Sequence, residues 1–220
     1  DFERVRQQMI VAARNASQQP DSIAEDEFYR LLYPDHPYGT PPAGTEETLK
    51  AIKRNQVVDF HKKYYVARNA VVAIIGDLTE AQARDITERL TGLLAKGEPA
   101  PKLPSAATPE NAVDRVLVYP STQSHILMGE PVLVRGDPDY FPLYLGNFIL
   151  GGSGLVSRIS EEIREKRGLS YSAYSYFIPM RQEGPYTLGL QTRNEKREEA
   201  LEVLRDTLRE FMEKGPTSAE

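Results

Sequence analysis

Arg164 and Tyr171, seven positions apart, are the pair of residues best suited to bind a substrate in this sequence. They stand on either side of Gly168, where a charged helical segment gives way to a strand rich in Tyr and Ser. Because glycine closes a helix in a left-handed conformation at low cost, a reversal there can bring the guanidinium and the phenol to one rim. An Arg fork beside a Tyr hydroxyl can bind a peptide carbonyl or a carboxylate. The segment alone equally fits a solvated Arg at the negative end of a helix and a half-buried Tyr in a sheet.

A glycine-rich run, Gly151-Gly152-Ser153-Gly154, precedes this helix and is the second candidate. Backbone N–H groups of such a run can bind an anion at a helix start. The run lacks a Walker lysine, dinucleotide-binding spacing and the Gly-x-Ser-x-Gly elbow of serine hydrolases. We therefore expect Gly151, Gly152 and Gly154 to form a flexible element beside the Arg–Tyr pair, with a plain joint between two helices as the alternative.

The histidines and cysteines predict no metal site in this chain. Its three histidines, His36, His61 and His125, are too far apart for any two to share a helical turn. A zinc site on a helix needs a His pair about four residues apart with an acid nearby. The absence of cysteine excludes disulfides, Cys-ligated zinc and thiol catalysis.

Composition narrows the classes of partner. The formal net charge of −5 and a pI near 5.4, without any basic block, argue against nucleic acid. No run of about 18 apolar residues is present, so we expect no direct membrane insertion. No secretory leader is visible, and the sequence itself leaves the compartment open.

Clustered rather than alternating helices and strands predict an α+β fold. We expect one domain in residues 1–95, a Pro-rich linker at 96–112 and a second domain in 113–220, each with a mainly antiparallel sheet covered by helices on one side. The apolar run Val71–Ile75 is predicted as a buried strand of the first sheet. Strands are predicted at 115–119 and 125–134, and the pair within 169–192 is expected to be central to the second sheet.

Both ends of the sequence resemble interior positions of a longer chain. Apolar residues recur at helical spacing from Phe2 onward with no capping signal before them. Thr217-Ser218-Ala219-Glu220 has the spacing of a capping box, which predicts a further helix. We interpret the chain as a fragment.

Four blocks together resemble the pitrilysin or insulinase-type (M16) zinc peptidases, a family that includes mitochondrial processing peptidase subunits and the core proteins of the cytochrome bc1 complex. No single block is diagnostic, but their order and spacing over nearly the whole chain are specific. The blocks are His36–Gly39 with Gly44-Thr45, Phe60–Ala70 running into Val72–Asp77, Leu150–Tyr171, and Lys214–Thr217.

The resemblance implies two similar layered domains within a larger assembly, whose two halves close around an extended peptide. Arg164 and Tyr171 match the family's Arg-x6-Tyr pair, which reaches the substrate backbone from the half opposite the zinc. In active members the zinc is held by an inverted His-x-x-Glu-His motif and a downstream Glu. Aligned on Pro20, the two acids of that downstream stretch fall on Val5 and Ala12, which cannot ligate zinc.

We therefore expect an inactive member: a subunit that positions peptide for a zinc-bearing M16-type catalytic partner or second half, with zinc only in that partner. The chain by itself is expected to have no catalytic activity. One alternative is a fragment of an active zinc endopeptidase whose motif lies upstream. Another is a structural core-type subunit of a membrane complex. Substrate, organism and oligomeric state are not predicted, and the resemblance slightly favours the bacterial periplasm.

Overall fold

The computed structural model describes all 220 residues. It contains α-helices, short 3-10 or π-helical turns (η) and three strands, and no helix meets the length and hydropathy needed to cross a membrane. Along the chain the elements are α1 (Phe2–Ala16), α2 (Pro20–Leu32), η1 (Pro37–Gly39), α3 (Glu46–Ala51), α4 (Arg54–Tyr64), η2 (Ala67–Asn69), α5 (Glu80–Thr91), β1 (Gln123–Leu133), α6 (Tyr140–Asn147), η3 (Phe148–Gly152), η4 (Gly154–Val156), α7 (Arg158–Ser160), η5 (Glu161–Glu165), β2 (Ser170–Phe177), β3 (Gly184–Arg193), η6 (Asn194–Lys196) and α8 (Arg197–Lys214).

The chain divides into two compact units, and each is described by itself. Unit 1 comprises Asp1–Val11 and Thr45–Lys102, and unit 2 comprises Ala12–Gly44 and Leu103–Glu220. Unit 1 is helical. A capping box opens α5, where the Thr79 side chain accepts from the backbone N–H of Gln82.

The predicted strand at Val71–Ile75 is not formed, which corrects the sequence expectation. Residues 70–76 form neither a helix nor a strand, and Val71 is 95% exposed and Ile75 fully exposed. No backbone hydrogen bond engages 71–75. The predicted strand at 115–119 is likewise unpaired. The composition of these runs suits strands, but a strand also needs a neighbour to pair its N–H and C=O groups. No strand is paired with either run.

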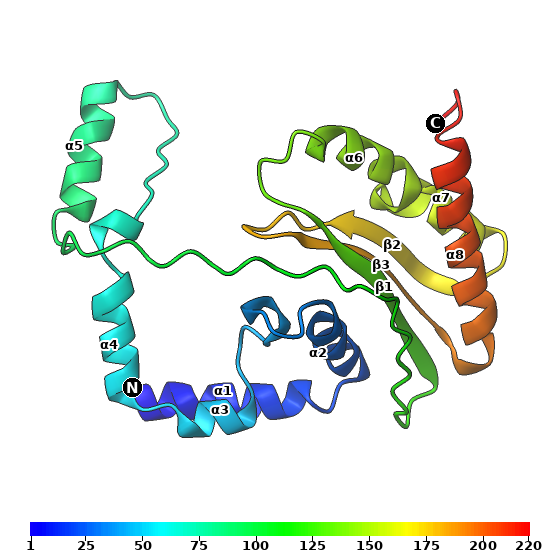
Figure 1. Cartoon of the computed structure of the whole chain (residues 1–220), viewed down its shortest axis with the longest axis horizontal. Coiled ribbons are helices and arrows are strands. Elements are labelled where there is room, and N and C mark those ends of the chain that lie inside the picture. Colours follow the sequence, from blue (N-terminus) through cyan, green and yellow to red (C-terminus); the bar gives the residue numbers. More distant parts are fainter. The chain divides into compact units, whose positions relative to one another are not determined.

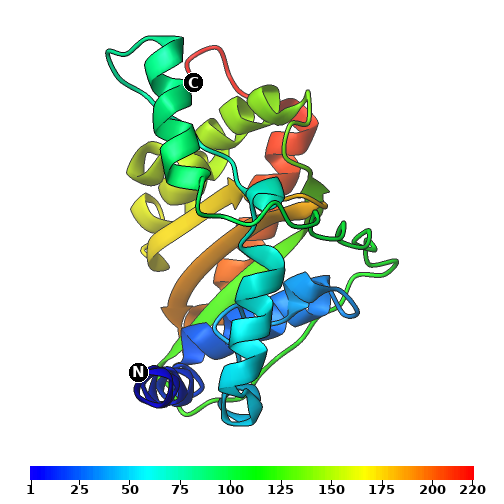
Figure 2. The ribbon, with the colours of Figure 1, turned by 90° about the vertical axis from the view of Figure 1, so that its left-hand side faces the viewer.

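Unit 2 is built on a three-stranded antiparallel sheet of order β1-β3-β2. Figures 1 and 2 show the three strands side by side, with β3 in the middle. The expected pairing of the strands within 169–192 is confirmed, with Ala173 opposite Leu190 and Ser175 opposite Leu188. Of this pair only β3 is central, and β2 is an edge strand, which corrects the prediction that both are central. With its helices, this sheet confirms the predicted α+β class.

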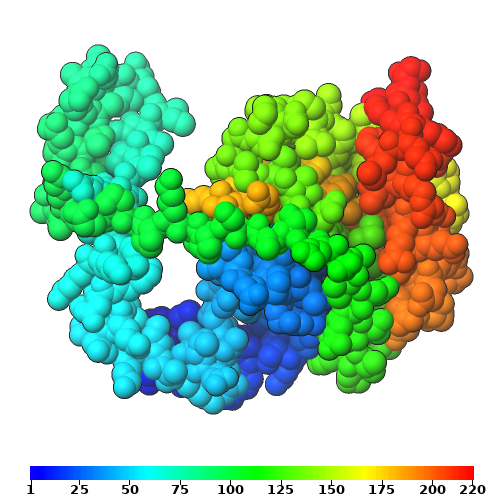
Figure 3. Space-filling model, in the orientation of Figure 1, coloured from blue at the N-terminus to red at the C-terminus, as the bar shows by residue number.

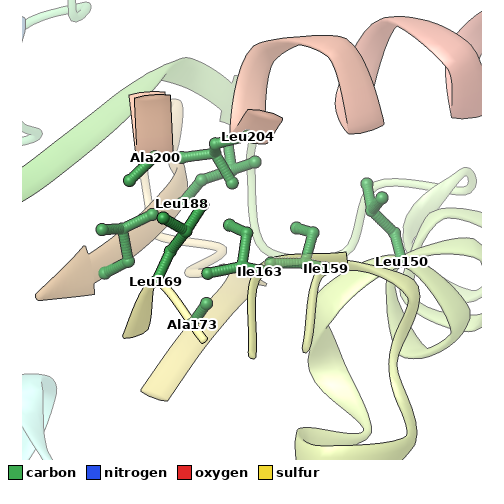
Figure 4. Packing of buried hydrophobic residues seen from close by; sticks show 9 residues of the cluster. Leu150, Ile159, Ile163, Leu169, Ala173, Leu188, Ala200 and Leu204 are labelled. Atoms are coloured by element: carbon green, nitrogen blue, oxygen red, sulfur yellow. The ribbon is translucent and has the colours of Figure 1, made fainter. Parts of the chain in front are cut away.

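The aliphatic core lies between this sheet and the segments α7, η5 and α8. Ile159, Ile163 and Leu204 have no exposed surface, and Leu188 of β3 is 1% exposed. Figure 4 shows these side chains converging between the strands and α8. Burying an aliphatic side chain contributes roughly 1.5–3 kcal/mol to the free energy of unfolding, so this cluster fixes η5 against the sheet.

Helix α2 covers the opposite face of the sheet, so helices lie on both faces and not on one side as predicted. Met128 of β1 packs against the aliphatic core. Because successive strand residues face opposite sides of a sheet, the Cβ position of the next residue, Gly129, lies on the other face. A Cβ on Gly129 would lie 3.0 Å from the Phe28 ring of α2. Tyr174 and Tyr176 of β2 stack on each other with ring centroids 5.4 Å apart.

Residues 12–44 fold with the C-terminal unit, so the compact units divide the chain differently from the predicted boundaries at 1–95, 96–112 and 113–220. The Tyr33 hydroxyl donates to the carbonyl of Glu183 at 2.9 Å, and the His36 ring lies 3.0 Å from the carbonyl of Pro104. These contacts join positions far apart in sequence, which local pattern does not reveal. The predicted division stays a prediction about the domains of the longer protein.

Tyr176, one of the two stacked tyrosines of β2, should make the protein less stable at alkaline pH. Burial, followed by the nearby Tyr174, Tyr29 and Glu25, raises the pKa of Tyr176 from 10 to about 12. The unfolded chain therefore loses this proton first, and the free energy of unfolding falls as pH rises from 10 to about 12, with no such effect below pH 10. Urea unfolding across this range should show a smaller decrease in Tyr176→Phe than in the parent. Equal decreases in both proteins would contradict the assignment.

Candidate functional site

The turn between η5 and β2 brings Arg164 and Tyr171 together. Gly168 has φ of 60°, the left-handed conformation that glycine adopts freely, so the predicted helix end is confirmed. Its N–H donates to the carbonyl of Arg164 at 2.9 Å, and the N–H of Leu169 donates to that of Ile163 at the same distance. Because Ile163 is fully buried, the turn is anchored to the core.

The guanidinium of Arg164 lies over the ring of Tyr171, 5.1 Å from its centroid. Tyr171 is 84% exposed, and the Arg164 side chain is 27% exposed. The guanidinium also contacts the neighbouring Glu165, with Nη1 and Oε1 3.2 Å apart. The predicted proximity of the two residues is thus present as a cation–π pair at the surface.

This arrangement leaves hydrogen-bonding groups available to a ligand. The guanidinium has five N–H donors. Its contacts with the Tyr171 ring and with Glu165 through Nη1 leave N–H groups to donate, and the Tyr171 hydroxyl forms no hydrogen bond within the chain. A guanidinium edge and a phenol O–H can donate together to a carbonyl or carboxylate oxygen. Neither group supplies a nucleophile beside a base, so the site is suited to binding rather than to bond cleavage.

Two of the three glycines in the Gly-rich run are closely packed, unlike the flexible element expected from sequence. A Cβ on Gly151 would lie 2.7 Å from the backbone N of Ser175 and closer still to its Oγ. A Cβ on Gly152 would lie 2.9 Å from Nδ2 of Asn147. Gly154 has φ of 66° and open space around it. The backbone therefore closely approaches β2 at Gly151 and the end of α6 at Gly152.

The Gly-rich run and the Arg–Tyr pair meet β2 at different points. Gly151 packs against Ser175, and Tyr171 lies four residues earlier in the same strand. At a rise of about 3.3 Å per residue, that is a separation of about 13 Å along β2. The strand links the two features, but they do not form one pocket.

Two buried polar residues and one partly buried tyrosine, all missed by sequence reasoning, form a hydrogen-bond network that joins the end of α6 to the sheet. Asn147 donates through Nδ2 to the carbonyl of Ser175 at 2.9 Å, and its Oδ1 accepts from Ser175 Oγ at 2.6 Å and Tyr186 Oη at 3.1 Å. Burial raises the pKa of Tyr186. Asn147 lies four residues before Gly151, at the end of an apolar helix, and a lone Asn there is the one sequence signal that could have pointed to this network.

The side chains of this chain do not fit a zinc ion. No group of three or more His, Cys, Asp or Glu side chains is placed to hold a metal. His36 accepts from the backbone N–H of Tyr38 through Nδ1, and His61 stacks on Tyr65. His125 lies separately on β1. No catalytic step through zinc can be assigned to these residues.

A shallow groove beside α8 is a weaker candidate. Its volume is about 380 Å³, and it is lined by Met128, Arg205, Leu208, Arg209, Met212 and Glu213. Figure 3 shows α8, orange to red, at the surface of this side of unit 2. The groove lacks a nucleophile, a metal-ligand set or an unpaired buried polar group, so its residues indicate no particular chemistry.

Known proteins match this chain over most of its length. A family model described as the peptidase M16 inactive domain matches residues 51–220. An uncharacterized zinc protease of Streptomyces coelicolor is 32% identical over 91% of the chain, and the uncharacterized zinc protease YmxG of Bacillus subtilis is 29% identical over 91%. The alignments cover 45% and 48% of those proteins, so the chain spans about half the length of the curated relatives it matches.

Solved structures also match this chain over nearly its whole length. The crystal structure of a peptidase M16 inactive domain from Pseudomonas fluorescens has a TM-score of 0.94 at 36% identity, over 99% of this chain and 53% of that one. A chain in complex III2 from Candida albicans has a TM-score of 0.77 at 15% identity, over 96% of this chain and 52% of that one. At that identity the second likeness shows the fold alone.

Proposed function

The chain belongs to the family of peptidase M16 inactive domains, and from this premise we propose that it is a non-catalytic part of a zinc protease assembly that holds extended peptide for a zinc-bearing partner. The observation that carries the proposal is the exposed cation–π pair of Arg164 and Tyr171. It presents donors suited to peptide carbonyls at a surface without a nucleophile–base pair. The zinc that cleaves the peptide would belong to a separate catalytic subunit or half.

The competing proposal is that the chain is part of one active zinc endopeptidase. It is favoured by the relatives that are called zinc proteases and are about twice as long. Elemental analysis of the full-length protein separates the two. Zinc bound at one ion per chain, by a His-x-x-Glu-His motif upstream of residue 1, would replace our proposal with this one.

Replacing Arg164 by Lys should weaken peptide binding at unchanged stability. A lysine keeps the charge but lacks the planar fork, and hydrogen bonds to a charged group contribute roughly 1.5–3 kcal/mol, so we expect at least about a tenfold loss of affinity. Tyr171→Phe keeps the ring and loses one donor, for a loss of about fivefold. The measurement is fluorescence anisotropy of a labelled, unstructured casein peptide, alongside the melting temperature.

Arg167→Lys is the matched control. Arg167 lies on the same helix end but pairs with Glu162, so this variant should bind peptide like the parent. Peptide turnover by the chain reconstituted with its zinc-bearing partner should fall most in Arg164→Lys, less in Tyr171→Phe and not at all in Arg167→Lys. Parental binding by both Arg164→Lys and Tyr171→Phe would make the pair merely structural. A parallel loss of binding and melting temperature would assign both residues to folding.

A further inference from the structure

Strand β2 contains one more residue than the paired stretch of β3 at the position of Tyr171. Ser170 is opposite Thr192 and Ala173 is opposite Leu190, so β2 advances three residues while β3 advances two. This is a β-bulge, a local irregularity that bends a strand and redirects a side chain. Tyr171 and Ser172 are the two bulged residues that face the single residue Gln191.

The bulge decides which face of the sheet Tyr171 occupies. In a regular strand, residues two apart share a face, so Tyr171 would point the same way as Ala173, which is 6% exposed and lies in the aliphatic core. With the extra residue, Tyr171 is 84% exposed, while Ser170 is 7% exposed. The large ring is thereby kept out of the core and available to Arg164.

The Ser170 hydroxyl holds the bulge together. Its Oγ accepts from the backbone N–H of Ser172 at 3.2 Å and lies 2.7 Å from two acceptors, the carbonyls of Ser172 and Gln191. One buried side chain thus bridges the residue after Tyr171 and the neighbouring strand. Beside it, Thr192 Oγ1 donates to the carbonyl of Leu169 at 2.6 Å and fixes the backbone that enters the bulge.

We propose that Ser170 is a positioning residue for the peptide-binding site, because its hydroxyl holds the bulge that aims Tyr171 outward at Arg164. The proposal rests on the proposed function, since it assumes that Tyr171 contacts peptide. Ser170 itself is buried, at 7% exposed, and is not proposed to contact peptide. It acts on peptide affinity only through the orientation of Tyr171.

A double-mutant cycle tests this inference with the full chain and the labelled casein peptide. Ser170→Ala should lower peptide affinity about threefold to fivefold, the scale of one neutral hydrogen bond in the complex. In a Tyr171→Phe background the same change should have no further effect, because the hydroxyl it positions is gone. Ser170→Thr, which keeps a hydroxyl, should bind peptide like the parent.

Ser172→Ala is the matched control, because it removes a hydroxyl from the other neighbour of Tyr171. The Ser172 side chain is exposed and forms no hydrogen bond. This variant should bind like the parent. Equal losses in Ser170→Ala and Ser172→Ala, additive losses in the cycle, or an unfolded Ser170→Ala would each overturn the inference. Failure of Tyr171→Phe to weaken binding would instead overturn the proposed function, so the two failures are distinguishable.

Discussion

Gly151→Ala is expected to destabilise unit 2 by about 3 kcal/mol, at the upper end of the cost of overpacking. The new methyl group would lie 2.7 Å from the backbone N of Ser175 and 3.0 Å from Ile159 Cδ1. The contact with Ser175 N is a contact with strand backbone, which cannot rotate away as a flexible side chain can. Either η3 must lift from β2 or the strand must shift, and both movements break the hydrogen bonds between Asn147 and Ser175.

Gly146→Ala, five residues earlier, is the matched control. Gly146 lies within α6, and its added Cβ would meet only Phe211 Cε1, at 4.0 Å. Alanine in a helix is favoured over glycine by about 0.8–1.0 kcal/mol, so this variant should be slightly more stable than the parent. Because the chain has two units, hydrogen exchange of β2 amides reports the effect locally. Similar exchange in the two variants would show that Gly151 is not closely packed.

Asn147→Ala should cost a similar amount, about 3 kcal/mol, for a different reason. The change leaves the Ser175 hydroxyl, the Ser175 carbonyl and the Tyr186 hydroxyl without the partners they have in the native chain. Ser175 is 1% exposed, so water cannot readily replace the amide, and each unpaired buried group costs roughly 1–3 kcal/mol. Urea unfolding followed by circular dichroism, with exchange of β2 amides, measures the loss.

Asn194→Ala tests whether burial causes that loss. Asn194 also bridges two segments, donating to the carbonyl of Ser121 at 2.6 Å and accepting from Ser124 Oγ at 2.9 Å, but it is exposed. Water can take over both bonds, so the cost should stay below about 1 kcal/mol. Comparable losses for the buried and the exposed Asn would mean that the network at Asn147 contributes no more than a surface contact.

Local sequence signals were enough to predict much of the fold. The helix end at Gly168 and the pairing of β2 with β3 both depend on residues close together in the chain. The strand expected at Val71–Ile75 depends on a pairing partner elsewhere, and the packing of α2 on the sheet depends on contacts such as that of Tyr33 with Glu183. Composition specifies what a segment is able to form, and only tertiary contacts decide whether it does.

In the candidate site, too, features set by neighbouring residues were predicted and features set by tertiary contacts were not. The spacing of Arg164 and Tyr171 around a glycine predicted their proximity, because a single turn joins them. The bulge at Ser170 was not foreseen, since it depends on register with β3. The close packing of Gly151 was missed because a glycine needed for mobility and one needed for a close backbone approach look alike in sequence.

The uncovered run at 70–76 has a consequence for the behaviour of the chain at high concentration. Ala70-Val71-Val72-Ala73-Ile74-Ile75-Gly76 contains no proline and no charge, the composition typical of segments that stack into fibrils. The backbone groups of residues 71–75 form no hydrogen bond within the chain, so copies of the chain can satisfy one another by edge-to-edge association. A strand laid against 71–75 would therefore protect solubility as well as complete a sheet.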